Sequence, residues 1–173
     1  MDNDVTSIID FGFGKATLLR EFVKKFQPRS VVAIDISKER YAELQKKAWT
    51  KKLKMEIHNQ SLTEMNFPTL LQKPCTLGIS NSVIQYIPDS ELASVLEKMA
   101  SYCKLLYLAV PTKEDYKRLG EDLGFADPYA HIRDGKFYKK LLSKYFRFVS
   151  FNLLESKLSP HKKIFEEELY IFT

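Results

Sequence analysis

The sequence has little of what secreted, membrane-spanning or metal-binding proteins need. Its 173 residues include 2 cysteines, Cys75 and Cys103, which lie in apolar stretches and lack the spacing of metal ligands. We therefore expect buried thiols in a reducing cytoplasm, and no metal site. No apolar run approaches the roughly 20 residues of a membrane span. The acidic start at residues 1–4 is unlike a signal peptide, so we expect no membrane partner.

Glycine and proline are also scarce, at 6 and 7 copies, which excludes collagen-like and low-complexity chains. Hydrophobic residues make up 45% of the chain and charged residues 28%, an ordinary composition for a globular protein. We find no internal repeat and no linker that would divide the chain, and its length suffices to bury a core. The sequence therefore predicts one domain over residues 1–173.

Positive charge exceeds negative charge, with a formal net charge of +5 and a pI near 9.0. Much of the excess comes from Lys46, Lys47, Lys51, Lys52 and Lys54. A solvated helix face explains this cluster, and so does an electrostatic patch for nucleic acid or an anionic substrate. Charge alone does not choose between them. We expect the solvated face.

Apolar runs alternate with segments of helical periodicity along most of the chain. Strands are predicted at residues 5–10, 31–34, 53–57, 76–79 and 105–110. Helices are predicted at residues 18–26, 37–48, 62–71, 88–103 and from 112 onward. This alternation is typical of βαβ units, whose parallel strands carry helices on both faces of the sheet.

The C-terminal part departs from this alternation. Residues 137–145 predict a helix, and residues 146–154 and 164–172 predict two further strands. The polar linker between these strands is too short for a crossover helix, so they must pair antiparallel. The expected fold is an α/β three-layer sandwich with a mostly parallel seven-stranded sheet and an antiparallel C-terminal strand.

A glycine-containing turn follows the first predicted strand directly. Its sequence is Asp10-Phe11-Gly12-Phe13-Gly14, and a helix begins just after it. A tight strand-to-helix turn needs a residue without Cβ, and a ligand lying on the turn needs bare backbone. Asp35 ends the second strand about twenty residues on, where a carboxylate can accept hydrogen bonds from both ribose hydroxyls of an adenosine. Together these features predict a nucleotide-type ligand.

Residues 5–19 and 32–36 resemble motifs I and II of the class I S-adenosylmethionine (SAM)-dependent methyltransferases. In that family an acid opens motif I and x-G-x-G follows at once, as after Asp10. Dinucleotide-binding Rossmann domains generally lack this acid and carry G-x-G-x-x-G, which residues 12–17 do not fit. Residues 77–89 are similar to motif IV and the helix start after it. The resemblance implies a Rossmann-like fold and SAM as cofactor.

The resemblance also implies cofactor contacts at the ends of the first four strands. They are Asp10, Phe11, Gly12, Gly14, Asp35, Ile36, Ser61, Leu62, Asn81, Ser82 and Gln85. The methionyl part of SAM would lie on the glycine turn with its amino group near Asp10, and Asp35 would hold the ribose.

The remaining contacts would surround the adenine and the reaction centre. Ile36 would flank the adenine, and Ser61 and Leu62 would contact its edge and face. Asn81 and Ser82 would face the methionyl group and the reaction centre.

Two catalytic candidates follow. Tyr86, with Gln85, would lie near the methyl donor or the acceptor's approach. His131 lies in the polar segment 127–134 after the fifth strand, whose end borders the ligand crevice in this fold, and it is a candidate base or acceptor contact.

The sequence departs from the family pattern at several positions. Ala16 stands where a third glycine is usual, Ser61 where an acid is frequent, and Cys75-Thr76 where the fourth strand often opens with Phe-Asp. The helices that usually precede motif I are also missing. Three alternatives follow: the lid is absent, a partner chain supplies it, or the sequence is part of a longer one.

The leading hypothesis is a methyltransferase that modifies an oxygen or nitrogen atom of a small molecule. An RNA methyltransferase is the alternative that the basic charge favours, although nucleic acid is not the expected partner. A non-catalytic SAM-fold scaffold subunit is the alternative that the departures favour. Residues 80–83, Ser-Asn-Ser-Val, are not the D/N-P-P-Y/F element of amino-methylating DNA enzymes.

Overall fold

The computed structural model describes residues 5–65 and 73–159. Within them, one sheet has the strand order β3-β2-β1-β4-β5-β7-β6. Its strands are β1 (Ser7–Phe11), β2 (Ser30–Asp35), β3 (Met55–Asn59), β4 (Cys75–Asn81), β5 (Cys103–Ala109), β6 (Phe146–Phe148) and β7 (Leu153–Ser156). The helices are α1 (Thr17–Phe26), α2 (Lys38–Lys46), α4 (Asp89–Tyr102), α5 (Lys113–Leu123) and α6 (Gly135–Leu142), with short 3₁₀ turns η1 (Thr50–Lys52) and η2 (Ile84–Tyr86).

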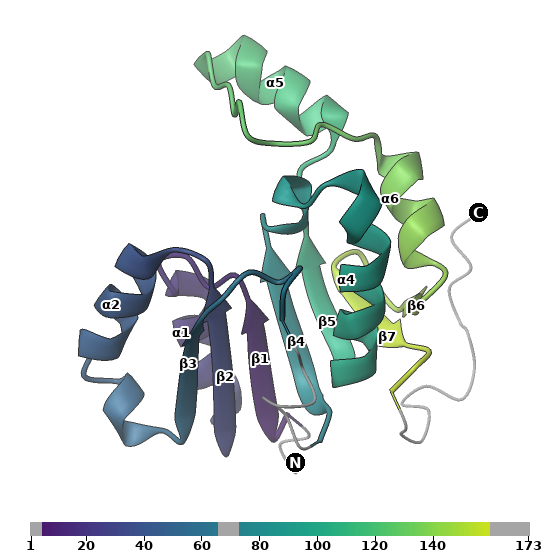
Figure 1. Cartoon of the computed structure of the whole chain (residues 1–173). Coiled ribbons are helices and arrows are strands. Elements are labelled where there is room, and N and C mark those ends of the chain that lie inside the picture. Colours follow the sequence, from purple (N-terminus) through teal and green to yellow (C-terminus); the bar gives the residue numbers. More distant parts are fainter. Residues whose placement is uncertain (1–4, 66–72, 160–173) are drawn as a thin grey trace.

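The sheet has a hydrophobic core on each face, as its alternating side chains require. Ile8 of β1 belongs to the core that includes Leu19 of α1 and Leu44 of α2. The next residue, Ile9, belongs to the core that includes Leu92 of α4. Figure 1 shows the helices on both faces of the sheet. The predicted three-layer α/β arrangement is confirmed.

Strand direction also agrees with the prediction. The parallel pairs are β1–β2, β1–β4, β2–β3 and β4–β5, whereas β7 runs antiparallel to both β5 and β6. The chain builds β2 and β3 on one side of β1 and then crosses to β4 on the other. Ligands of open α/β sheets bind at such a switch point, beyond the carboxyl ends of the strands.

The antiparallel pair lies elsewhere than predicted. The expected strand at residues 146–154 is two strands, β6 and β7, because the chain reverses between them. The Val149 N–H donates to the Leu153 carbonyl at 2.9 Å, and the Asn152 side chain donates to the Leu108 carbonyl at 3.0 Å. The predicted strand at 164–172 lies outside the described residues. Of the predicted helix at 62–71, the described part forms only a turn.

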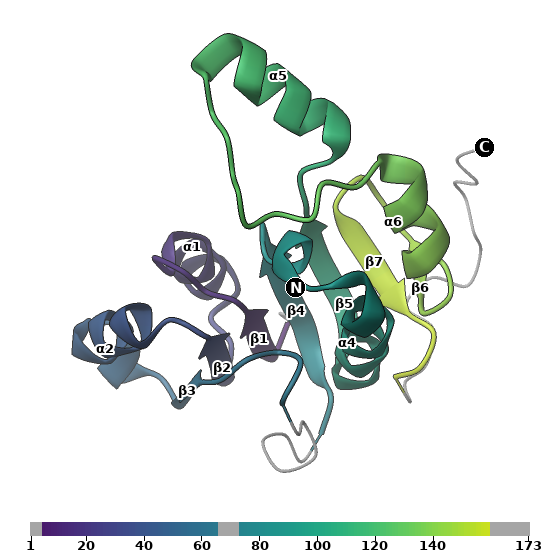
Figure 2. The same ribbon diagram turned by 45° about the horizontal axis from the view of Figure 1, so that its top comes forward.

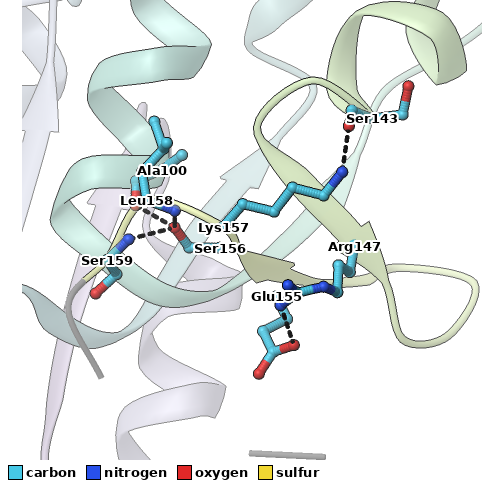
Figure 3. A network of polar contacts seen from close by, with 8 residues as sticks. All are labelled: Ala100, Ser143, Arg147, Glu155, Ser156, Lys157, Leu158 and Ser159. Atoms are coloured by element: carbon cyan, nitrogen blue, oxygen red, sulfur yellow. Dashed lines mark hydrogen bonds and ion pairs between the residues drawn. The ribbon is translucent and has the colours of Figure 1, made fainter. Parts of the chain in front are cut away.

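A polar network fixes the end of β7 to the helices beside it (Figure 3). The Ser156 hydroxyl donates to the Ala100 carbonyl of α4 and accepts from the backbone N–H groups of Leu158 and Ser159, at 3.0 and 2.9 Å. The Lys157 ammonium donates to the Ser143 carbonyl, just after α6, at 2.7 Å. These bonds hold the hairpin against α4 and α6.

Both cysteines are free and buried, facing each other in register on β4 and β5, as expected of structural thiols. In the described parts of the chain, no helix is long and apolar enough to cross a membrane. Nor do those parts contain a group of three or more His, Cys, Asp or Glu side chains that would hold a metal ion.

Candidate active site

A cavity of about 440 Å³ opens at the carboxyl ends of the central strands. Its volume lies within the roughly 300–1,000 Å³ of sites that bind small molecules and cofactors. Most of the predicted site residues border it, namely Gly12, Gly14, Asp35, Ile36, Ser61, Leu62, Asn81, Ser82 and Tyr86. The structure therefore brings together residues from the ends of β1, β2, β3 and β4.

A second cavity of about 220 Å³ borders the same glycine turn. Gly12, Gly14 and Asn81 line both cavities. Asp10 and Lys15 line only the second of the two. The glycine turn thus lies between two hollows, one reaching toward β3 and one toward the start of α1.

The two glycines of the turn are needed for different reasons. Gly12 has φ +101°, and a Cβ there would stand 2.5 Å from a methyl group of Val83. Glycine is therefore required at position 12 both by the contact with Val83 and by the positive φ. Gly14 has φ +52°, and no described atom lies within 4 Å of where its Cβ would stand. The bare position that faces open space is therefore Gly14.

Ala16 stands where the family usually has glycine, and its φ is 56°. A left-handed conformation disfavours residues with a Cβ by about 1–2 kcal/mol. Ala16 therefore adopts the left-handed backbone conformation that glycine would adopt at lower cost.

Asp35 organises the turn through both of its carboxylate oxygens. One accepts from the Gly14 N–H at 2.7 Å, and the other from the Ser37 N–H at 2.8 Å. A carboxylate offers about four lone-pair directions, so each oxygen retains capacity for a further donor. Asp35 is therefore a structural clamp of the turn and still has acceptor positions toward the cavity it lines.

Asp10 is a buried carboxyl group that receives no hydrogen bond from the described residues. It is 3% exposed. Burial raises its pKa well above the usual range, and the negative charge of Asp35 adds to the rise. An isolated buried carboxylate is unfavourable in water-poor surroundings unless a cation or donor compensates it. Because Asp10 lines the second cavity, this site is suited to a cationic group.

The same cavity also has groups that favour a negatively charged ligand. Helix α1 begins after Ala16 without a side-chain cap and without an acidic residue in its first turn. Free N–H groups at a helix start attract negative charge. Lys15 lines the same cavity, and the Lys47 ammonium donates to the Lys15 carbonyl at 2.7 Å. The cavity therefore offers an acidic and a basic side.

Two of the predicted cofactor contacts lie elsewhere. Phe11 is fully buried in the core on the α4 face, and Gln85 is 1% exposed. Neither borders either cavity. The 3₁₀ turn η2 directs Ile84 and Gln85 inward and leaves Tyr86 at the surface, a local geometry that the sequence does not reveal.

Tyr86 lines the larger cavity and is 47% exposed. Its hydroxyl donates to Asp127 Oδ2 at 2.7 Å. Burial and this hydrogen bond raise the pKa of Tyr86 to about 12, so the phenol is neutral at physiological pH. The His131 side chain is exposed and borders neither cavity, although its backbone N–H donates to the Gln85 carbonyl at 2.9 Å. The segment after α5 is thereby attached to η2 at two points.

Arg133 supports the cavity wall from behind, a role that sequence analysis missed. It is 6% exposed and donates to the carbonyls of Ile84 and Ile87 at 3.2 and 2.5 Å, and to Asp89 Oδ1 at 2.7 Å. The guanidinium also lies 5.8 Å from the centre of the Tyr138 ring. It therefore holds η2, the start of α4 and α6 together. In the sequence it is only an arginine within a polar segment, which gives no such signal.

Comparison with known proteins agrees with this geometry. Residues 8–105 match the family model described as a methyltransferase domain. No curated protein matches the chain.

Solved structures share the fold. A SAM-dependent methyltransferase from Clostridium acetobutylicum ATCC 824 superposes with a TM-score of 0.70 at 14% identity, covering 90% of this chain and 86% of that one. An O-methyltransferase family protein from Burkholderia thailandensis superposes with a TM-score of 0.66 at 11% identity, covering 93% of this chain and 54% of the other. The plantazolicin methyltransferase BpumL, solved in complex with SAH, has a TM-score of 0.64 at 14% identity, covering 80% and 55%. The chain thus spans only about half the length of the latter two.

The matched family model covers more than half of the chain and includes the glycine turn, Asp35 and the end of β4. Together with the strand order and the shared fold, it shows that this chain belongs to the class I SAM-dependent methyltransferases, a family with a Rossmann-like fold that uses S-adenosylmethionine.

Proposed function

We propose that this chain transfers a methyl group from SAM to an oxygen or nitrogen atom of a small-molecule acceptor. The observation that carries the proposal is the pair of cavities that meet at the glycine turn. Asp35 borders one of them, and Asp10, which has no hydrogen-bond donor among the described residues, borders the other. SAM likewise consists of an adenosine and a charged amino acid joined at a sulfonium.

The larger cavity suits the adenosine half. Asp35 has acceptor positions left for the ribose hydroxyls after binding Gly14 and Ser37. Ile36 and Leu62 border the cavity with apolar side chains that can cover an adenine ring. Ser61 also borders it, and its hydroxyl is engaged with Thr63 at 2.9 Å.

The smaller cavity suits the amino-acid half. An ammonium group beside Asp10 would compensate the buried carboxylate. A carboxylate on the other side would meet Lys15 and the uncapped start of α1. This distribution of charge matches an amino-acid zwitterion, and Gly14 and Asn81, which border both cavities, would lie at the junction.

Methyl transfer requires the protein mainly to position the acceptor. When bound, SAM supplies a methyl group on a positively charged sulfur, which a lone pair of the acceptor displaces in line. The acceptor's oxygen or nitrogen would bond to that methyl group as the bond from sulfur to methyl breaks, SAH would leave, and the acceptor's proton would pass to water or to a base. The chain's own residues hold the acceptor in line and exclude water. Ser82 and Tyr86 border the larger cavity, and we expect the acceptor to approach beside them.

Calorimetry with SAH tests the cofactor site. We expect the wild type to bind SAH and Gly14→Leu to abolish binding, because the new side chain enters the open space between the cavities. Gly124→Leu is the matched control, since Gly124 has φ +60° with open space around it but ends α5. Equal SAH affinity in a folded Gly14→Leu variant would place the cofactor elsewhere.

A further inference from the structure

The segment between α5 and α6 meets the candidate active site at Tyr86. Figure 2 shows α5 and the returning chain standing beyond the carboxyl ends of β4 and β5. The hydrogen bond from Tyr86 to Asp127 joins this segment to the cavity wall, across 41 positions of sequence. We propose that Asp127 positions the Tyr86 hydroxyl to accept a hydrogen bond from the methyl acceptor, and that this acceptor is an aromatic alcohol. The inference rests on the proposed function.

The hydrogen-bond polarity of Tyr86 carries the first step. A phenol has one proton to donate and two lone pairs that accept. The proton of Tyr86 is committed to the Asp127 carboxylate at 2.7 Å, and a carboxylate at neutral pH can only accept. The Gln85 side chain also donates to this hydroxyl, so Tyr86 offers its remaining lone pair as an acceptor toward the cavity that it lines. Its partner must be a donor, as the O–H of an alcohol is.

Asp127 also shapes the segment that carries it. Its second carboxylate oxygen accepts from the Tyr129 N–H at 3.1 Å, while the first binds Tyr86. One carboxylate thus sets both the orientation of the Tyr86 hydroxyl and the turn at Pro128 and Tyr129. Asp127 is a positioning residue, because it acts through Tyr86.

The same segment exposes an aromatic residue near the Tyr86 hydroxyl. Tyr129 is 81% exposed, and its backbone N–H binds the same carboxylate as Tyr86, which is itself 47% exposed. Exposed aromatic side chains that adjoin a ligand cavity are typical of a binding surface for an apolar or aromatic molecule. Since Tyr86 belongs to both the cavity and this surface, an aromatic ring lying here would present its hydroxyl to Tyr86.

The test compares two probes, 2-naphthol and 2-methoxynaphthalene, on protein saturated with SAH. The probes share the aromatic body, but only the naphthol can donate a hydrogen bond. We expect the wild type to prefer 2-naphthol by about fivefold, the scale of one net hydrogen bond. Tyr86→Phe should remove this preference and retain binding of 2-methoxynaphthalene.

The Asp127→Asn variant tests whether Asp127 orients the Tyr86 hydroxyl or only stabilises the segment between α5 and α6. An amide has only one acceptor oxygen, which would accept from the Tyr129 N–H. The amide nitrogen would then face the Tyr86 hydroxyl as a donor and turn the hydroxyl proton toward the cavity. The preference for 2-naphthol should fall to that of Tyr86→Phe although Tyr86 is present. Asp122→Asn, which removes the same charge from the exposed surface of α5, should keep the full preference.

The outcomes are distinct. All four proteins are compared at saturating SAH, and absence of SAH binding by the wild type would refute the proposed function instead. If SAH binds, then failure of 2-naphthol to bind the wild type overturns the inference. So does an undiminished preference in Tyr86→Phe or Asp127→Asn.

Discussion

Asp10 gives the sharpest prediction of cofactor recognition. It is a buried carboxyl group without a donor among the described residues, and it lines the smaller cavity. Asp10→Asn keeps the shape of the side chain and removes its ability to carry negative charge. An ammonium beside the carboxylate forms a charge-assisted hydrogen bond, so SAH affinity should fall by about 2 kcal/mol, roughly thirtyfold.

The assay is calorimetry with two ligands, SAH and 5′-methylthioadenosine, which lacks the amino acid. The loss should concern SAH alone, because 5′-methylthioadenosine has no ammonium to place beside Asp10. At pH values below the raised pKa of Asp10, SAH binding by the wild type should also release a proton, since the ammonium lowers that pKa. Calorimetry in two buffers of different ionisation enthalpy measures that proton, and the variant should not release it.

Stability provides an independent check. The pKa of Asp10 is raised in the folded state above its ordinary value of 3.8, so the folded protein binds more protons than the unfolded chain between the two pKa values. Its stability therefore falls as pH rises through this window. The Asn variant lacks this loss, and its melting temperature should exceed that of the wild type above the window and approach it at lower pH. An equal fall in affinity for both ligands, or no gain in stability, would refute the role of Asp10.

Three further predictions concern the surroundings of the site. Arg133→Met should lower the free energy of unfolding by about 3 kcal/mol in urea titration, because the Ile84 and Ile87 carbonyls and Asp89 lose their donor. Arg118→Met, which breaks only an exposed pair with Asp115, should change it by less than about 1 kcal/mol. Lys46→Glu with Lys51→Glu should leave SAH affinity unchanged, and the wild type should bind RNA only weakly and with no steep salt dependence. If instead RNA binds tightly and with strong salt dependence, and the Lys46 and Lys51 double variant loses this binding, an RNA substrate would be favoured. Lys47→Met should weaken SAH binding a few-fold, since Lys47 holds the Lys15 carbonyl beside the smaller cavity.

Lys47 also changes the view of the lysine cluster that sequence analysis gave. Five lysines close together in sequence look like one solvated face. In the structure Lys46 is exposed, whereas Lys47 is partly buried and bonds to the glycine turn 32 positions earlier. Neighbours in a helix point in different directions, so only the packing of α2 beside the turn separates their roles.

Much of the fold follows from local sequence pattern. Short apolar runs and helical periodicity placed β1 to β5 and the helices α1, α2 and α4, because burial on a sheet imposes its period on each segment separately. The spacing from Gly12 to Asp35 indicated a nucleotide-type ligand, and the acid at Asp10 indicated the family. The same reasoning missed the reversal between β6 and β7. A turn at Ser150 to Asn152 depends on pairing with β5, which local pattern does not contain.

The sequence by itself determined the order of strands and helices and the residues at the strand ends. Only the tertiary structure decided that Gln85 is buried while Tyr86 lines the cavity, that Val83 requires glycine at position 12, and that Asp127 binds the Tyr86 hydroxyl. Arg133 likewise meets Asp89 across 44 positions. The physical reason is that periodicity reports how one segment is buried, whereas a hydrogen bond or a close contact between distant segments depends on how those segments pack against each other.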